Sequence, residues 1–144
     1  MNCTPSPRYT VEKIKKEKSD DKITKKSAPY TINGKKYVPT EKPSQGKKFK
    51  GLTSFYGYND GFNGKKTANG ETFDMYGLTA AHKTWPFNTW IEVKNLSNGR
   101  TIVVRINDRG PYVGDRILDL SYGAAKEIRM IEAGVQEVEI TILR

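Results

Sequence analysis

Short runs of alternating apolar and polar residues dominate the chain from about residue 50 onward. Six of these runs are rich in β-branched and aromatic residues and are separated by turn-forming residues, which is typical of strands. They are residues 51–57, 76–81, 90–96, 101–107, 116–121 and 135–143. Many short strands favour a closed barrel, because closure removes exposed sheet edges. We therefore expect a mainly β fold, a six-stranded barrel with one or two short helices.

Two Asn-Gly pairs predict tight turns between strands. Asn98-Gly99 separates the third and fourth runs, which should therefore pair as a hairpin. Asn33-Gly34 lies within "YTINGKKYVPT", where apolar or aromatic residues stand on both sides of the turn. A short ordered segment is thus expected near residues 29–39, ahead of the barrel.

One helix is predicted after the fifth run. Ser121 suits an N-cap, and "YGAAKEIRM" directs Ala125, Ile128 and Met130 toward a core at helical spacing. Gly134 lies just past the expected end of the helix.

The charge of the chain is concentrated near its start. The formal net charge is +9, and residues 1–50 hold 14 Lys and Arg against 5 Asp and Glu, whereas the rest of the chain is balanced. This first part of the chain holds too few apolar residues for their burial to offset the conformational entropy lost on ordering. We expect residues 1–28 to be flexible, residues 1–47 to act as a basic tether, and residues 48–144 to form the compact domain.

The lysines of the tether are not interleaved with aromatic residues, so nucleic-acid binding is not expected. A solvated charge run and a loose attraction to an anionic envelope surface both remain open. No stretch approaches the roughly 18 apolar residues of a membrane span, and the start lacks a signal-peptide core, so the protein is cytosolic or a leader has been removed.

Composition also argues against several kinds of site. The single cysteine, Cys3, cannot form an internal disulfide. One histidine and one distant cysteine do not supply a metal-ligand set, so no metal is expected. A Gly-rich phosphate loop between strand and helix is missing, and we expect no cofactor.

Four blocks of the sequence resemble, in order, the double-psi β-barrel domain of the rare lipoprotein A (RlpA) family. They are "GLTSFYG", "TANGETFDMYGLTAAHKTWPFNTWIEVKNLSNGR", "VVRINDRGPY" and "RILDLSYGAAKEI". The resemblance covers about residues 50–143. It implies a six-stranded barrel of interleaved psi loops and lytic transglycosylase activity on peptidoglycan glycan strands.

Such an activity needs few catalytic groups. Cleavage of a β-1,4 glycosidic bond requires an acid that protonates the leaving oxygen and a group that stabilises an oxocarbenium-like centre. In a lytic transglycosylase the C6 hydroxyl of muramic acid attacks C1 in place of water, and the product is a 1,6-anhydro sugar. The deprotonated acid can then act as the base, so one well-placed carboxylic acid can suffice.

The resemblance places the functional trio of the family on Glu71 in "TANGE", His82 in "TAAH" and Asp108 in "NDRG". Related double-psi barrels, including expansins, look to rely on an aspartate at the position that Asp119 in "LDLS" resembles. We expect Asp108 to be the general acid-base, with Asp119 as its competitor. Glu71 is expected to stabilise positive charge or to orient His82, which would hold a substrate hydroxyl or tune the acid.

Each of these four residues also has an ordinary structural explanation. Asp108 could close an Asx turn or pair with Arg109, and Asp119 could interact with the dipole of the following helix. Glu71 follows a turn and could be solvated, and His82 could be a hydrogen-bonded, half-buried histidine. Only the four residues together favour the catalytic interpretation.

Contacts to the substrate are expected from residues beside the candidate trio and from loop aromatics, whose rings can stack on a pyranose. These residues are Tyr56, Asn69, Thr79, Asn107, Arg109 and Tyr122. Two other functions remain open on the same barrel. One is a glycan-binding or wall-loosening module without cleavage, as in expansins, and the other is a hydrolytic glycosidase.

Cys3 fits the resemblance, because the family is named for lipoproteins whose mature chain begins with a lipidated cysteine followed by a polar tether. A stray surface cysteine is the alternative. The resemblance implies a monomer in the bacterial cell envelope, in the periplasm, whose partners are peptidoglycan strands and, through a lipid on Cys3 alone, the outer membrane. Many members carry a further C-terminal module for septal glycan, so septal targeting is not predicted for this chain.

If a leader is restored, Cys3 should carry lipid and the protein should fractionate with envelope membranes, because two acyl chains give stable anchoring. Membrane fractionation of the wild type and of Cys3→Ala measures this. An unchanged membrane fraction in Cys3→Ala would contradict the lipoprotein interpretation.

Overall fold

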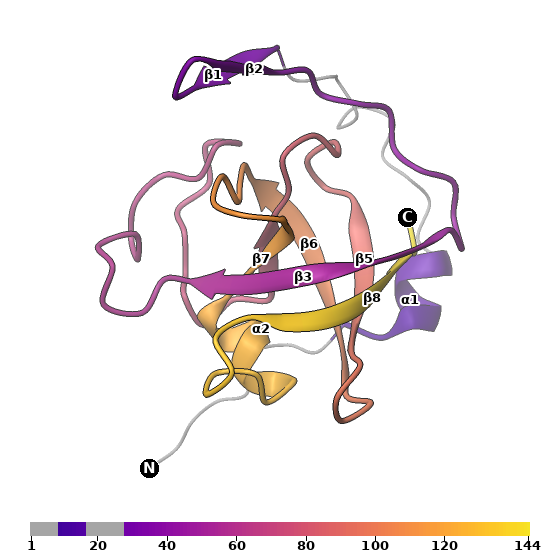
Figure 1. The fold of residues 1–144 in the computed structure, drawn as a ribbon. Helices are drawn as coiled ribbons and strands as arrows, with labels where there is room; N and C mark the ends of the chain where they lie inside the picture. The colour runs from indigo at the N-terminus through magenta and orange to yellow at the C-terminus, as the bar shows by residue number, and fades with distance from the viewer. Residues whose placement is uncertain (1–8, 17–27) are drawn as a thin grey trace.

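The computed structural model describes residues 9–16 and 28–144, and these form a barrel preceded by a small hairpin and a short helix (Figure 1). Among these residues, neither helix is long and apolar enough to cross a lipid bilayer. In chain order, the elements are α1 (Val11–Lys16), β1 (Tyr30–Ile32), β2 (Lys35–Tyr37), β3 (Lys48–Tyr56), β4 (Thr79–Ala81), β5 (Trp90–Asn95), β6 (Thr101–Asp108), β7 (Arg116–Ser121), α2 (Tyr122–Glu127) and β8 (Gln136–Ile142).

Six strands close into a barrel in the order β3-β7-β4-β6-β5-β8. Two neighbouring pairs are parallel, β3 with β7 and β4 with β6, and the other pairs are antiparallel. Parallel neighbours need long crossover connections. Here the crossovers include the loop between β3 and β4 and the loop between β6 and β7, and these loops carry most of the candidate residues. The predicted six-stranded, mainly β barrel is confirmed.

The turn signals of the sequence are confirmed. The hairpin around Asn98-Gly99 joins β5 and β6, and the hairpin around Asn33-Gly34 joins β1 and β2. Asn33 and Gly34 both have positive φ angles, 50° and 80°, as a tight turn of this kind requires. Strand β4 begins later than expected, because Asp74 Oδ1 accepts a hydrogen bond from the backbone N–H of Tyr76 and closes a turn there.

The predicted helix forms as α2, with Ser121 Oγ accepting a hydrogen bond from the backbone N–H of Ala124. Ala125, Ile128 and Met130 are buried, as expected. Gly123 lets the helix approach the preceding loop, since a Cβ there would lie 2.7 Å from the carbonyl oxygen of Tyr76. The helix therefore packs directly against the loop that leads into β4.

The interior of the barrel is filled by aliphatic side chains that alternate with outward-facing residues along each strand. In β5 and β8, every second residue is buried over part of the strand. The fully buried strand residues of this core are Ile91, Val93, Val104, Ile106, Leu118, Leu120, Val138, Ile140 and Ile142. Because the core fills the barrel, any substrate site must lie on its outside or at its ends.

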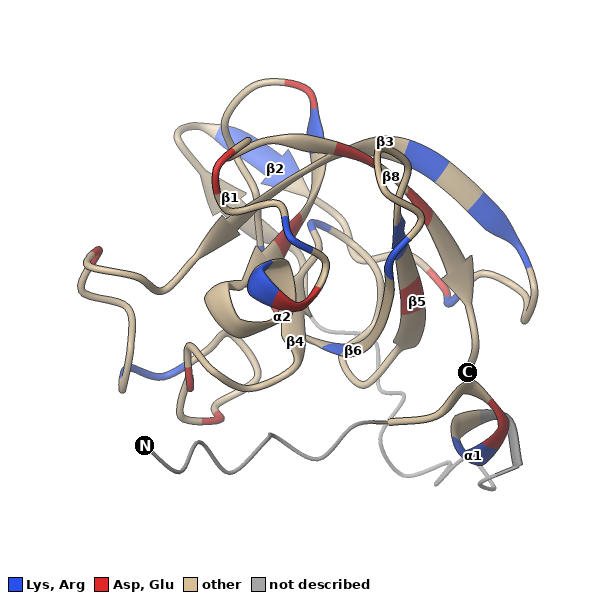
Figure 2. Cartoon of the chain, turned by 90° about the horizontal axis from the view of Figure 1, so that it is seen from below, with Lys and Arg blue, Asp and Glu red and all other residues tan. Residues whose placement is uncertain are grey.

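Several basic residues lie along β2 and the start of β3 (Figure 2). Lys48 and Lys50 point outward from β3 on either side of Phe49, and Lys48 pairs with Glu139 of β8 at 3.3 Å. The pair is largely exposed, so it contributes little to stability.

Residues 9–16 differ from the flexible tether expected for this part of the chain. Ile14 of α1 is 1% exposed and packs in a small apolar cluster with Val103 and Leu143. The ring of Tyr9 lies edge-on to Trp90, with their centroids 4.5 Å apart. The average composition of the segment, rich in lysine, did not reveal that one face of this short helix is apolar. That apolar face is enough to dock the segment on the barrel.

Replacing Ile14 with alanine should lower the melting temperature by a few degrees, because the change removes buried apolar surface worth about 1–2 kcal/mol where the helix can partly adjust. Thermal unfolding followed by circular dichroism measures the shift. Lys13→Ala, on the exposed side of the same helix, is the matched control. Equal melting temperatures in all three proteins would mean that α1 does not dock in solution.

Candidate functional site

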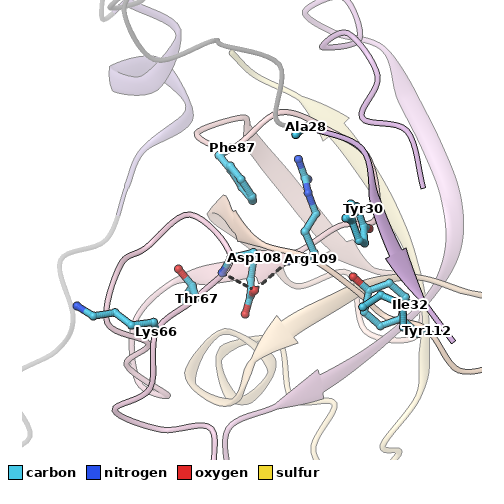
Figure 3. Close-up of a pocket in the computed structure, with 10 residues that line it drawn as sticks. Ala28, Tyr30, Ile32, Lys66, Thr67, Phe87, Asp108, Arg109 and Tyr112 are labelled. Carbon is cyan, nitrogen blue, oxygen red and sulfur yellow. Dashed lines mark hydrogen bonds between the residues drawn. The ribbon is translucent and has the colours of Figure 1, made fainter. Parts of the chain in front are cut away.

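The side chain of Asp108, the last residue of β6, is held by three donors from different parts of the chain. Its Oδ2 accepts a hydrogen bond from the hydroxyl of Tyr56 at 2.9 Å. Its Oδ1 accepts from the backbone N–H groups of Ala68 and Arg109, both at 2.9 Å. Bonds from a strand, a crossover loop and its own turn leave this carboxylate one orientation, and Figure 3 shows the two backbone bonds, from Ala68 and Arg109.

Asp119 lies on β7, two strands away from Asp108. Ala81 of β4 is the cross-strand partner of both aspartates, of Asp108 on one side and of Asp119 on the other. Asp119 Oδ1 accepts a hydrogen bond from Ser54 Oγ at 2.9 Å. Burial raises the pKa of Asp119 to about 6, opposed by the bond from Ser54 and by the charge of Arg116. Asp119 therefore holds its proton to a higher pH than an ordinary aspartate does.

Tyr56 connects the two aspartates electrostatically. Burial raises its pKa, and the charge of Asp108, the hydrogen bond to it, and the charge of Asp119 add to the effect. Tyr56 thus stays protonated and acts as a donor to Asp108. Its ring stacks on Phe73 with the centroids 4.5 Å apart, which fixes the hydroxyl.

Glu71 forms a two-pronged ion pair with Arg105 of β6, with N–O distances of 2.8 and 2.9 Å. It also accepts a hydrogen bond from the side-chain amide of Asn69 at 2.9 Å. The bond from Arg105 is the main cause of the lowered pKa of Glu71, with further lowering by Asn69 and Asn107. Glu71 is therefore an ionised residue that holds its loop to β6.

His82 is a neutral, well-packed side chain. Its ring stacks on Trp85 at 3.8 Å, and Nδ1 accepts hydrogen bonds from the backbone N–H groups of Thr84 and Trp85. Burial, followed by the charges of Arg109 and Lys83, lowers the pKa of His82 to about 3. Because Nδ1 is an acceptor, the neutral ring carries its proton on Nε2.

Arg109 packs between the loop after β4 and the ring of Phe87. Its guanidinium donates to the carbonyl oxygens of His82 and Trp85, and its central carbon lies 4.1 Å from the centroid of Phe87. Burial lowers its pKa, although nearby tyrosines and Asp108 oppose this. Arg109 thus joins the segment of Asp108 to the segment of His82.

A pocket of about 510 Å³ opens beside Asp108. Its volume lies within the range of roughly 300–1,000 Å³ that is common for ligand sites. Crossover-loop residues, the turn after β6 and the β1–β2 hairpin all contribute to it (Figure 3). The lining residues are Ala28, Tyr30, Ile32, Lys66, Thr67, Ala68, Phe87, Asp108, Arg109 and Tyr112.

The structure brings some of the predicted substrate residues to this pocket and places others elsewhere. Arg109 lines the pocket. Tyr56 does not line it but donates a hydrogen bond to Asp108, which does. Asn69 supports Glu71, and Asn107 is only 3% exposed. Tyr122 stacks on Tyr58, with centroids 4.9 Å apart, in an aromatic cluster beside α2.

Thr79 keeps a buried polar atom at the start of β4. Its Oγ1 has no hydrogen-bond partner among residues 9–16 and 28–144, and the same holds for Asn107 Oδ1. Neither atom lies among the groups that line the pocket. Both atoms are therefore buried and do not face the pocket.

Several residues of the site were missed by the sequence interpretation. Arg105 could have been found, because an arginine inside the apolar run "TIVVRIND" must find a partner. Ser54, Tyr30 and Ile32 carried no such signal, since only long-range packing brings them to the carboxylates and the pocket. Within the described part of the chain, no three His, Cys, Asp or Glu side chains gather closely enough to hold a metal ion.

Comparison with known proteins identifies one family. Residues 48–140 match a family model described as lytic transglycolase. The chain is 53% identical over 115 residues to the endolytic peptidoglycan transglycosylase RlpA of Campylobacter jejuni, which covers 80% of this chain and 41% of that protein. It is 51% identical over 115 residues to the protein of the same name from Helicobacter pylori strain 26695, covering 80% of this chain and 36% of that protein.

The fold is also found in solved structures. The Streptomyces papain inhibitor superposes with a TM-score of 0.57 and 23% identity, over 69% of this chain and 97% of that one, which supports the fold alone. The closed barrel with its two parallel pairs and the match over residues 48–140 define a double-psi β-barrel of the lytic transglycolase class. Within that class, the chain belongs to the rare lipoprotein A (RlpA) family. It spans less than half the length of the two RlpA proteins named above.

The raised pKa of Asp119 predicts a pH-dependent stability. Between its ordinary value of 3.8 and about 6, the folded protein binds this proton more tightly than the unfolded chain does. The contribution of Asp119 to the free energy of unfolding therefore falls as pH rises through this window. Asp119→Asn should melt several degrees above the wild type at pH 7 and near it at pH 4. Asp115→Asn, at an exposed position, is the control; a difference that does not change with pH would contradict the assignment.

Proposed function

We propose that the chain cleaves the β-1,4 bond between N-acetylmuramic acid and N-acetylglucosamine in peptidoglycan strands and leaves 1,6-anhydro-muramic acid ends. The observation that supports this most directly is the Asp108 carboxylate, fixed by three donors at the edge of a pocket of suitable volume. Membership of a family whose relatives are named endolytic peptidoglycan transglycosylases supports the reaction type. Strands that lack stem peptides are the proposed substrate.

Asp108 is the proposed general acid-base. As the acid it gives a proton to the leaving oxygen while the bond from that oxygen to C1 of the muramic acid breaks. The C6 hydroxyl of the same sugar then bonds to C1, and its proton passes to the Asp108 carboxylate. No water is consumed, and the acid is regenerated. The donor groups of Tyr56 and Ala68 stabilise the ionised form of Asp108 between these two transfers.

Glu71 and His82 are proposed to act around this centre. The Glu71–Arg105 ion pair fixes the loop of residues 67–71, and that loop supplies the Ala68 N–H to Asp108. Glu71 also keeps its negative charge, which favours a positively charged sugar centre. Neutral His82 can present its Nε2–H to a substrate oxygen.

Asp119 is the competing candidate for the acid. Its pKa of about 6 leaves a substantial protonated fraction at mildly acidic pH, which is what a proton donor needs. Asp108 takes precedence because it lines the pocket. The two assignments differ in which single substitution removes activity.

The cell envelope is the proposed place of action, because the substrate is there. A periplasmic monomer anchored to the outer membrane through a lipid on Cys3 fits the basic tether composition. Cys3 lies outside the described residues, so the membrane-fractionation test with Cys3→Ala is the direct measurement.

Asp108→Asn should reduce cleavage of peptide-free glycan strands by roughly 10²-fold or more, because the isosteric amide cannot exchange a proton. Mass spectrometry of the wild-type products should find muramic acid ends lighter by one water than hydrolysed ends. Asp115→Asn, at an exposed position that makes none of the hydrogen bonds to Asp108, is the matched control and should keep full activity.

Three results would redirect the proposal. Retained activity in Asp108→Asn together with an inactive Asp119→Asn would transfer the acid role to Asp119. Reducing ends that take up ¹⁸O from labelled water would make the protein a hydrolase. Glycan binding with no products from the wild type would favour the non-cleaving, expansin-like module.

A further inference from the structure

The β1–β2 hairpin has one face turned toward the barrel and one face turned to solvent. Tyr30 pairs with Tyr37 across the hairpin, and their rings stack with the centroids 5.2 Å apart. Tyr30, Ile32 and Tyr37 are partly buried, whereas Thr31 and its partner Lys36 are exposed. A free hairpin of this length would be marginal, so its inner face must be stabilised by the barrel.

The hairpin is attached to the loop that carries His82. The hydroxyl of Tyr30 donates to the carbonyl oxygen of Lys83 at 2.6 Å, and the backbone N–H of Thr40 donates to the carbonyl oxygen of Thr84 at 2.8 Å. Thr84 in turn donates its N–H to His82 Nδ1. Through these bonds, a segment outside the matched family domain is fixed beside the candidate catalytic residues.

A third attachment is aromatic. The ring of Tyr112, in the loop after β6, lies 5.3 Å from the ring of Tyr37 and 6.2 Å from that of Tyr30, centroid to centroid. Burial and a side-chain hydrogen bond with Tyr30 raise the pKa of Tyr112, so its hydroxyl stays protonated. The three tyrosines make one rigid aromatic cluster.

This cluster forms a wall of the pocket beside Asp108. Tyr30, Ile32 and Tyr112 stand on one side of the pocket, and Thr67 and Asp108 stand on the other (Figure 3). Without the hairpin, the pocket would lose this wall and become an open surface of the barrel.

We propose that the β1–β2 hairpin is part of the substrate site, and that Tyr30, Ile32 and Tyr112 form a saccharide-binding wall for one hexosamine unit next to the bond that is cleaved. The proposal rests on the proposed glycan-cleaving function, and it assigns a specificity role to Tyr30 and Ile32, which precede the family domain.

The chemistry of the wall fits a sugar ring. The rings and the aliphatic side chain offer apolar surface to the C–H face of a pyranose, while the Tyr112 hydroxyl and the Asp108 carboxylate offer partners to its polar groups. An aliphatic ligand would remove water from the polar edge of the pocket at Asp108 without supplying a hydrogen bond in its place, which is costly. A carbohydrate satisfies both kinds of surface at once.

The matches to relatives are consistent with a role for the hairpin. Residues 48–144 are too few to contain a match of 115 residues, so the matches to the Campylobacter jejuni and Helicobacter pylori proteins reach back into the segment that carries the hairpin. The family model begins only at residue 48. The similarity to these relatives therefore extends beyond the barrel itself.

The test uses the full chain and two measurements. The first is steady-state cleavage of peptide-free glycan strands by the wild type, Ile32→Ser, Tyr30→Ala and Tyr112→Ala. The second is calorimetric binding of a peptide-free N-acetylglucosamine–N-acetylmuramic acid tetrasaccharide to the same variants in an Asp108→Asn background, where cleavage is suppressed. Thr31→Ala, on the outer face of the hairpin, is the matched control.

Each wall variant should raise KM and weaken tetrasaccharide binding roughly threefold to tenfold, the size expected for one lost ring or aliphatic contact, with kcat changed less than about twofold. Thr31→Ala should match the wild type, and Ile32→Leu should restore most of the affinity. Ile32→Ser is the decisive variant, because Ile32 has no hydrogen bond to the barrel that its loss could break.

The possible results separate this proposal from the proposed function. Wild-type KM and binding in Ile32→Ser, while the wild type cleaves normally, would overturn the saccharide wall and leave the transglycosylase intact. A fall in kcat and melting temperature with KM unchanged would also overturn it, since that pattern means the hairpin only supports the His82 loop. Weakened binding in the wall variants of a protein that forms no 1,6-anhydro products would support the wall and refute the cleavage.

Discussion

The site depends on the register of the short strand β4 between β6 and β7. Ala81 is paired with Asp108 on one neighbour, in parallel, and with Asp119 on the other, antiparallel. Neighbouring strands in a sheet lie roughly 5 Å apart, so this register holds the two aspartates about 10 Å apart on strands from distant parts of the sequence. A shift of one residue would turn one of the side chains to the opposite face of the sheet. Ala81 itself is buried between the two strands, and Tyr56 reaches Asp108 from β3.

The carboxylates of the site differ in their surroundings. Asp108 collects three hydrogen bonds at the pocket edge, whereas Asp119 is buried with the single hydroxyl of Ser54 as its partner, and burial dominates its pKa. Glu71 differs from both, because its ion pair with Arg105 lowers its pKa and keeps the carboxylate ionised. The pKa of Glu71 is thus lowered and that of Asp119 raised, which is how a single scaffold separates electrostatic and acid roles.

Segments outside the barrel complete the site. Two hydrogen bonds and a tyrosine cluster hold the hairpin beside the loop that carries His82. Helix α1 docks through Ile14 against β6 and β5, the strands that carry Arg105 and Trp90. Both segments belong to the lysine-rich third of the chain, where the Asn33-Gly34 pair predicted the hairpin but the composition did not predict the docked helix. A few apolar side chains with correct spacing are enough to dock such a segment, since each needs only a small matching surface on the barrel.

Local chemistry along the sequence determined the strands, the two Asn-Gly turns and the Ser121 cap, because each depends on residues close together in the chain. The ordered blocks also pointed to the family and to Glu71, His82, Asp108 and Asp119. The tertiary structure alone decided that β3 pairs with β7 and β4 with β6, that Arg105 binds Glu71, and that Tyr30 and Ile32 stand beside Asp108. These contacts join residues more than 25 positions apart, and their free energy comes from burial and charge pairing that exist only once the barrel has closed.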